Sequence, residues 1–255
     1  MSFDVTSAAY ARFMGRYSRP LAVGLADLVG VEAGQRALDV GCGGGALTSV
    51  LVDRLGAANV CAVDPSESFV AALPALLPDV EVQRAVAERL PYADRSFDRT
   101  LAQLVVHFMT DPVAGLAEMA RVTRPGGAVA ANVWDHAGGE GPLATFWRAA
   151  RDLDPTVPDE SALPGAADGD LDALFTAAGL AEPRSTRLVV SVEHPSFEEW
   201  WDPFTLGVGP AGAHVAALDA DGRAALRERC RELLPEAPFT VHAVAWTAWW
   251  VRPAG

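Results

Sequence analysis

A cluster of glycines flanked by two carboxylates is the part of this sequence best suited to chemistry. In the stretch "ALDVGCGGGALTSVL", residues 37–51, four of the five positions from Gly41 onward are glycine, and Asp39 stands two residues before them. Gly41 and Gly43 begin the spacing G-x-G-x-x-[GA], in which glycine lets the backbone approach a ligand without a Cβ in the way. Asp64 follows about 20 residues later, where its carboxylate could bind the two hydroxyls of a ribose. The pattern therefore predicts a site for an adenosine-containing cofactor.

Asp39 distinguishes two kinds of adenosine cofactor. A dinucleotide carries a negatively charged pyrophosphate, which proteins bind with backbone N–H groups at a helix start and not beside a carboxylate. S-adenosylmethionine (SAM) has no phosphate and carries an ammonium group and a sulfonium, for which a carboxylate is favourable. We therefore expect SAM; the alternative is that Asp39 is a solvated residue at the end of a strand.

The elements that would position these residues alternate between strands and helices. Such an alternation predicts a doubly wound α/β sheet, whose ligands lie at the carboxyl ends of its strands. The first helix is predicted to have Ser18 as its N-cap. Strands are predicted at residues 36–40, 59–64, 80–86, 96–103, 124–134, 184–194 and 239–253, and helices at residues 18–30, 45–57, 66–78, 111–123 and 170–180.

Two segments interrupt this alternation. Residues 135–169 are rich in Gly, Pro and Asp, and residues 195–238 contain two predicted helices, over 196–205 and 214–234. Each follows a strand, so both are expected to leave the sheet at its carboxyl edge and to form a helical cap over the glycine loop. The predicted organisation is a single domain over residues 1–255: N-terminal helices at 1–35, a cofactor-binding core at 36–134, cap insertions at 135–169 and 195–238, and a closing strand at 239–253.

Four sequence segments occur in a familiar order: "LDVGCGGG", "AVDPSESFV", "AERLPYADRSFD" and "EMARVTRPGGAVAA". Together they resemble the class I SAM-dependent methyltransferases, in particular the subgroup of the ubiquinone/menaquinone-biosynthesis enzymes. The resemblance implies the Rossmann-like methyltransferase fold, a mostly parallel seven-stranded sheet with an antiparallel last strand. It also implies SAM as cofactor and S-adenosylhomocysteine (SAH) as product. The cofactor-binding residues that it implies are Arg16, Asp39, Gly41, Cys42, Gly43, Asp64, Pro65, Ala87, Glu88 and Gln103.

The adenine contact departs from the pattern of this family. The family often has an aspartate just before the Ala-Glu pair, but the corresponding residue here is Val86. Glu88 or the backbone near Ala87 would then have to bind the adenine.

Methyl transfer requires an aligned acceptor and only sometimes a general base. The segment "AQLVVHF" after the fourth strand lacks the Asn/Asp-Pro-Pro-Tyr signature of amino-group methylation, which disfavours nucleobase and glutamine-amide acceptors. His107 in this segment is the candidate base because an imidazole titrates near neutrality, and a packing role is the alternative. His136 is a candidate substrate contact, and the histidine spacing matches no metal site.

Aromatic and basic residues outside the core motifs are candidates for substrate contacts. The stretch "YARFMGRYS" predicts a helix before the core, on which Arg16 would suit the carboxylate of the methionine portion and Tyr17 the acceptor; a plain surface helix is the alternative. Trp147, Trp200 and Trp201 lie in the insertions, where they would form an apolar or planar pocket or, alternatively, plain hydrophobic core. The expected acceptor is therefore a small apolar or aromatic metabolite.

Composition disfavours several classes of partner. The formal net charge of −13 argues against nucleic acid and against anionic membrane surfaces. The three cysteines form no CxxC pair, and the sequence shows neither a secretory signal nor a membrane span, so we expect a cytoplasmic protein with free thiols, monomeric or homodimeric. Two alternatives to a methyltransferase remain. One is a SAM-fold binding protein or an enzyme that uses SAM without methylation, and the other is a nicotinamide-dependent oxidoreductase.

Overall fold

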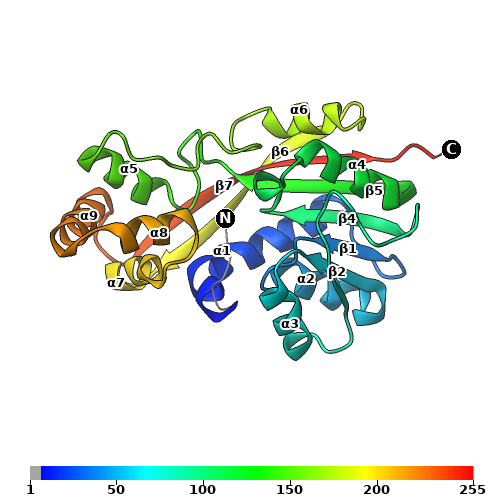
Figure 1. Ribbon diagram of the computed structural model, residues 1–255, viewed down its shortest axis with the longest axis horizontal. Coiled ribbons are helices and arrows are strands. Elements are labelled where there is room, and N and C mark those ends of the chain that lie inside the picture. Colours follow the sequence, from blue (N-terminus) through cyan, green and yellow to red (C-terminus); the bar gives the residue numbers. More distant parts are fainter. Residues whose placement is uncertain (1–6, 255) are drawn as a thin grey trace.

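Seven strands form one sheet at the centre of the molecule (Figure 1). The computed structural model describes residues 7–254, with side chains described from residue 13 onward. The strands are β1 (Ala37–Val40), β2 (Val60–Asp64), β3 (Glu81–Arg84), β4 (Phe97–Gln103), β5 (Thr123–Trp134), β6 (Arg184–His194) and β7 (Phe239–Val251). Their order is β3-β2-β1-β4-β5-β7-β6, and β7 runs antiparallel to both of its neighbours. The predicted fold class is confirmed.

Helices cover both faces of the sheet, as a parallel sheet requires (Figure 1). On one face lie α1 (Ser7–Leu28), α2 (Ala46–Leu55) and α3 (Glu67–Leu76), and on the other lie α4 (Pro112–Val122) and α6 (Asp170–Ala177). β1 and β2 are buried along their whole length, with one apolar cluster on each side of them. Within residues 7–254, no helix has both the length and the apolar character that a membrane span needs.

α1 begins well before the predicted start. The helix runs unbroken through Ser18 and Pro20, so the prediction of an N-cap at Ser18 was wrong. The hydroxyl of Ser18 instead donates to the carbonyl oxygen of Met14 at 3.0 Å. A serine can bond a backbone carbonyl one turn back as readily as it caps a helix start, and the sequence alone does not distinguish the two.

The inserted segments gather at one end of the molecule (Figure 1). They form α5 (Ala144–Leu153), α7 (Phe197–Trp201), the short 3₁₀ helix η3 (Asp202–Leu206), α8 (Gly209–Ala217) and α9 (Ala220–Leu233). The single helix predicted over residues 214–234 is thus two helices. Leu218 is extended, and the carboxylate of Asp219 accepts the N–H of Gly222 at 2.8 Å, which starts α9.

Candidate functional site

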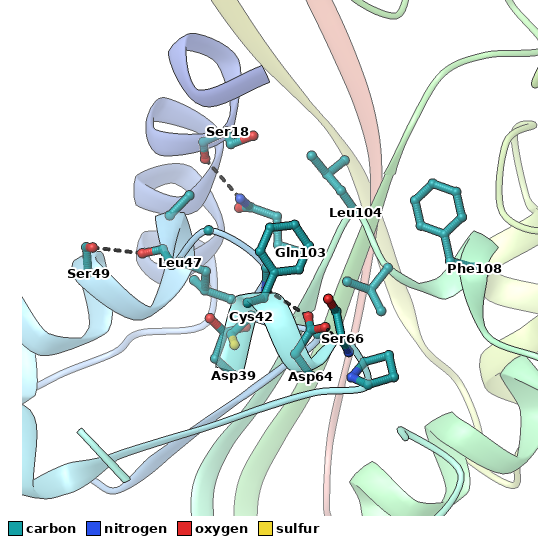
Figure 2. Close-up of a pocket in the computed structure, with 18 of the residues that line it drawn as sticks. Ser18, Asp39, Cys42, Leu47, Ser49, Asp64, Ser66, Gln103, Leu104 and Phe108 are labelled. Carbon is teal, nitrogen blue, oxygen red and sulfur yellow. Dashed lines mark hydrogen bonds between the residues drawn. The ribbon is translucent and has the colours of Figure 1, made fainter. Parts of the chain in front are cut away.

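A pocket of about 550 Å³ opens at the carboxyl ends of β1, β2 and β4 (Figure 2). Its walls are the glycine loop between β1 and α2, the start of α3, the end of β4 and one face of α1. The pocket lies where the strand order reverses, as expected of a ligand site in a doubly wound sheet. The predicted site residues in its lining are Asp39, Gly41, Cys42, Gly43, Asp64, Pro65 and Gln103.

The glycine loop has backbone conformations that favour glycine. The φ angles are +78° at Gly41 and +48° at Gly43. The N–H groups of Gly41 and Cys42 both donate to the carbonyl oxygen of Val63, which fixes the loop to β2. A Cβ on Gly41 would lie 2.4 Å from a methyl carbon of Val105, whereas a Cβ on Gly43 would meet nothing within 4 Å. Packing therefore requires glycine at position 41, while position 43 borders open space.

Asp39 is a buried carboxylate in the pocket wall. It is 1% exposed, and the hydroxyl of Thr48 donates to its Oδ2 at 2.6 Å. Burial raises the pKa of Asp39 to about 7, although the hydrogen bond from Thr48 acts in the opposite direction. A positive group close to a buried acid stabilises its ionised form. An ammonium or sulfonium group in this pocket would therefore suit Asp39.

Asp64 holds the glycine loop in place from the end of β2. Its Oδ2 accepts the N–H of Gly43 at 2.9 Å, and its Oδ1 accepts the N–H of Ser66 at 2.8 Å. Burial raises the pKa of this carboxyl group. Each carboxylate oxygen has two lone pairs, so each retains one for a further donor. Asp64 thus shapes the loop and still has the capacity to bind a diol.

The end of β4 contributes an unpaired amide oxygen and a strained turn. Gln103 donates from Nε2 to the carbonyl oxygen of Ser18 in α1 at 2.9 Å, while its Oε1 is buried without a partner (Figure 2). Leu104 has a φ of +59°, and its N–H donates to both the main-chain and the side-chain oxygen of Asn132. Such strain in a pocket wall is frequent at functional sites. An ammonium ligand would provide the hydrogen bond that Oε1 of Gln103 lacks.

Three predicted cofactor contacts lie outside the pocket lining. Ala87 is buried below the surface, and Oε1 of Glu88 accepts the N–H of Asp111 at 3.0 Å. Arg16 is directed toward the inserted segment, where it forms an ion pair with Glu199. The structure does not bring these three residues to the glycine loop.

His107 and His136 lie close together but outside the lining. His107 belongs to the 3₁₀ helix η2 (Val106–Phe108), and its ring centroid is 6.1 Å from that of His136. Burial, with a smaller contribution from His136, lowers the pKa of His107 to about 3, and burial lowers that of His136 to about 4. Both imidazoles are therefore neutral at neutral pH, and His107 would be a weak base.

The predicted substrate residues of the insertions lie in hydrophobic core. Trp147, Trp200 and Trp201 are each at most 5% exposed, and they belong to one apolar cluster with Phe204 and with Tyr17 of α1. Among the described residues, neither insertion contributes to the pocket lining. A role of these side chains toward an acceptor stays a prediction.

The helix before the core was predicted to reach the cofactor through Arg16, but the residues of α1 that line the pocket were missed in the sequence. Gly15, Ser18 and Arg19 line the pocket, and their spacing of three to four residues places them on one face of the helix. This helical spacing was the signal in the sequence that could have identified the three residues as one face of a helix. The arginine of α1 that reaches the pocket is thus Arg19, in place of the predicted Arg16.

Comparisons with known proteins point to one family. Residues 38–131 match the methyltransferase domain family. An uncharacterized methyltransferase of Mycobacterium tuberculosis is 38% identical over 135 residues, 53% of this chain and 52% of that protein. A demethylmenaquinone methyltransferase of Beutenbergia cavernae is 35% identical over 125 residues, 49% of this chain and 50% of that protein. This chain therefore spans about half the length of the curated relatives that it matches.

A solved structure shares the fold over nearly the whole chain. The YcgJ protein from Bacillus subtilis superposes with a TM-score of 0.59, covering 92% of this chain and 100% of that chain. Its sequence is 19% identical, so this likeness concerns the fold alone.

Proposed function

Because this chain carries a methyltransferase domain of the class I, SAM-dependent family, we propose that its pocket binds SAM and that the protein methylates a small apolar or aromatic acceptor. The observation that carries the proposal is the pair of buried carboxylates around the glycine loop. Asp39 has a pKa raised by burial to about 7, and Asp64 keeps two lone pairs free at the neighbouring strand end. Such a pair suits a ligand with a cation and a diol and does not suit a pyrophosphate.

The ribose and the methionine portion of the cofactor have candidate partners in the lining. Asp64 would accept hydrogen bonds from the ribose hydroxyls. Asp39 and Oε1 of Gln103 would bind the ammonium group of the methionine portion, and Arg19 would bind its carboxylate. When bound, SAM supplies an activated methyl group, so the protein's own residues mainly align the acceptor and exclude water.

The acceptor would approach where the lining is apolar, at the end of β4. Leu104, Val105 and Phe108 form this part of the pocket. A base with a pKa as low as that of His107 accepts a proton weakly, so we expect an acceptor whose attacking atom is unprotonated or acidic. Matched relatives are named demethylmenaquinone methyltransferases, and methyl transfer needs a nucleophilic acceptor, so the reduced hydroquinone form of demethylmenaquinone is the first acceptor to test.

Calorimetric titration tests the cofactor. We expect SAM and SAH to bind and NAD⁺ not to bind. Asp64→Asn should weaken SAM binding by at least about tenfold, because it replaces charge-assisted hydrogen bonds with neutral ones. Asp79→Asn, at an exposed aspartate away from the pocket lining, is the matched control. Binding of NAD⁺ in place of SAM would contradict the proposal.

Acceptor-dependent formation of SAH tests the reaction. The purified chain, SAM and the hydroquinone form of demethylmenaquinone, or another planar acceptor, are incubated together, and SAH is quantified. Tight SAM binding without SAH formation across a broad panel of acceptors would favour a SAM-binding protein or a non-methylating SAM enzyme.

A further inference from the structure

α1 separates the pocket from the inserted segments. Gly15, Ser18 and Arg19 line the pocket, whereas Arg16 and Tyr17 face the inserted helix α7 and the end of β6. In a helix of about 3.6 residues per turn, these two sets lie on opposite sides. α1 also packs against β6 and η3, so its position depends on elements from the second half of the chain.

Four side chains connect α1 to those elements through one hydrogen-bonded chain, which we call the latch: Arg16, Tyr17, His194 and Glu199. The hydroxyl of Tyr17 lies 2.8 Å from Nε2 of His194, and Nδ1 of His194 lies 2.7 Å from Oε2 of Glu199. Arg16 completes the chain: its Nη1 pairs with Oε1 of Glu199, and its Nη2 donates to the carbonyl oxygen of Glu193 at 2.9 Å.

The protonation states of His194 and Glu199 determine which atom donates in each hydrogen bond of the latch. Burial lowers the pKa of His194, so its imidazole is neutral at neutral pH. Burial would raise the pKa of Glu199, but Arg16 and His194 outweigh it and lower that pKa, so the carboxylate is ionised. A carboxylate only accepts, so Nδ1–H of His194 donates to Glu199 and Nε2 accepts the hydroxyl proton of Tyr17.

The latch is also shielded from water at its centre. Tyr17 is 5% exposed and His194 is 4% exposed. Removing one partner would leave a buried polar group without a hydrogen bond, which is unfavourable. The latch therefore favours one position of α1 over others.

We propose that Arg16, Tyr17, His194 and Glu199 are positioning residues that hold α1 against the cofactor pocket and slow the release of the bound cofactor. The inference rests on the proposed function, because it takes this pocket as the SAM site. Gly15, Ser18 and Arg19 form the wall that the latch holds, and the bond from Gln103 to the carbonyl oxygen of Ser18 fixes the same wall from β4. The inserted segment thus acts on a pocket that it does not line.

The dissociation rate of SAH tests the latch. Tyr17→Phe removes only the hydroxyl, and Glu199→Gln keeps the size of the side chain but removes its charge. Surface plasmon resonance of SAH over the immobilised full chain gives both rates. In each variant we expect the dissociation rate to rise about three- to tenfold, in line with the loss of one or two hydrogen bonds, with a nearly unchanged association rate.

Glu198→Gln is the matched control. Glu198 is the neighbour of Glu199 in α7, but it pairs with Arg227 and Arg231 of α9 and, among the side chains described from residue 13 onward, with none of α1. This variant should keep both wild-type rates. The latch is rejected if the dissociation rate is unchanged in folded Tyr17→Phe and Glu199→Gln, or if it rises equally in Glu198→Gln. If these two variants show only a slower association of SAH, the change would reflect a partly unfolded population, and this result would also reject the latch. Failure of the wild-type chain to bind SAH would reject the proposed function as well, so the two failures are distinguishable.

Discussion

At the scale of single residues, the protonation of Asp39 affects the stability of the whole chain. The folded chain holds this proton up to a pH of about 7, whereas an unperturbed aspartate, with a pKa of 3.8, releases it at lower pH. The folded state therefore binds more protons than the unfolded state between these values. Under that condition the free energy of unfolding falls as the pH rises.

Asp39→Asn should remove this contribution. Asparagine keeps an oxygen that can accept the Thr48 hydroxyl but has no proton to release. Between about pH 4 and about pH 7, the free energy of unfolding should therefore decline less steeply in the variant than in the wild-type chain without ligand. Urea unfolding at a series of pH values measures the difference. If the free energy of unfolding changes with pH equally in the variant and the wild-type chain, Asp39 has the same pKa in the folded and the unfolded state.

The two glycines of the loop should respond differently to alanine. Gly41→Ala places a Cβ against Val105, so we expect it to lower both the free energy of unfolding and the affinity for SAH. Gly43→Ala has open space beside it, so its cost in stability should be limited to about 1–2 kcal/mol of backbone strain, while SAH binding is weakened by the new Cβ. Calorimetry and urea unfolding measure the two quantities.

Val105→Ala provides the internal check. Combined with Gly41→Ala it should recover part of the lost stability, and combined with Gly43→Ala it should recover none. Equal recovery in both would show that Val105 is not the residue that excludes a side chain at position 41.

At the scale of elements, the sequence predicted those features that depend on residues close together in the chain. β1 and β2 are short, buried and mostly apolar, and Asp39, the glycines and Asp64 lie within or directly after them, so their order along the chain was enough. The docking of α1 could not be predicted in this way. It depends on bonds such as Gln103 to Ser18 and Tyr17 to His194, which join residues 85 and 177 positions apart. For the same reason, Arg19 could not be preferred to Arg16 as the pocket residue.

The helices of the cap should depend on their buried tryptophans. Trp200 is 3% exposed and packs against Phe204 with ring centroids 4.9 Å apart. Trp200→Ala should lower the free energy of unfolding by about 3–5 kcal/mol, and Trp200→Phe by less. Urea unfolding measures both. Unaltered stability together with reduced acceptor turnover would instead assign Trp200 to the substrate.

At the scale of the whole molecule, β7 joins the inserted helices to the part of the sheet that lines the pocket. It pairs with β6 from Phe239 to Trp249 and with β5 from Ala245 to Val251. The apolar cluster of the cap also includes Tyr17 of α1 and Trp134 of β5. These shared contacts favour cooperative unfolding of the two parts.

Ligand-linked unfolding tests this cooperativity. Tryptophan fluorescence reports both parts of the molecule, because Trp147, Trp200 and Trp201 lie in the insertions and the other four tryptophans lie in β5 and β7. SAH at 100 times its dissociation constant should raise the free energy of unfolding by about 2.7 kcal/mol, and fluorescence and far-ultraviolet circular dichroism should show the same shift. A second fluorescence transition that SAH leaves unmoved would show that the inserted helices unfold separately.

The separation of the pocket from the insertions has a consequence for protein engineering. The lining comes from residues 15–108, and residues 195–238 leave and re-enter the sheet through β6 and β7 alone. Exchanging that segment for one from another protein of the same fold would therefore alter the inserted helices without replacing any residue that lines the pocket. The graft would still need a carboxylate in place of Glu199, because Arg16 and His194 both bond to it. A chimera without that carboxylate would combine a complete cofactor pocket with a loosened N-terminal wall.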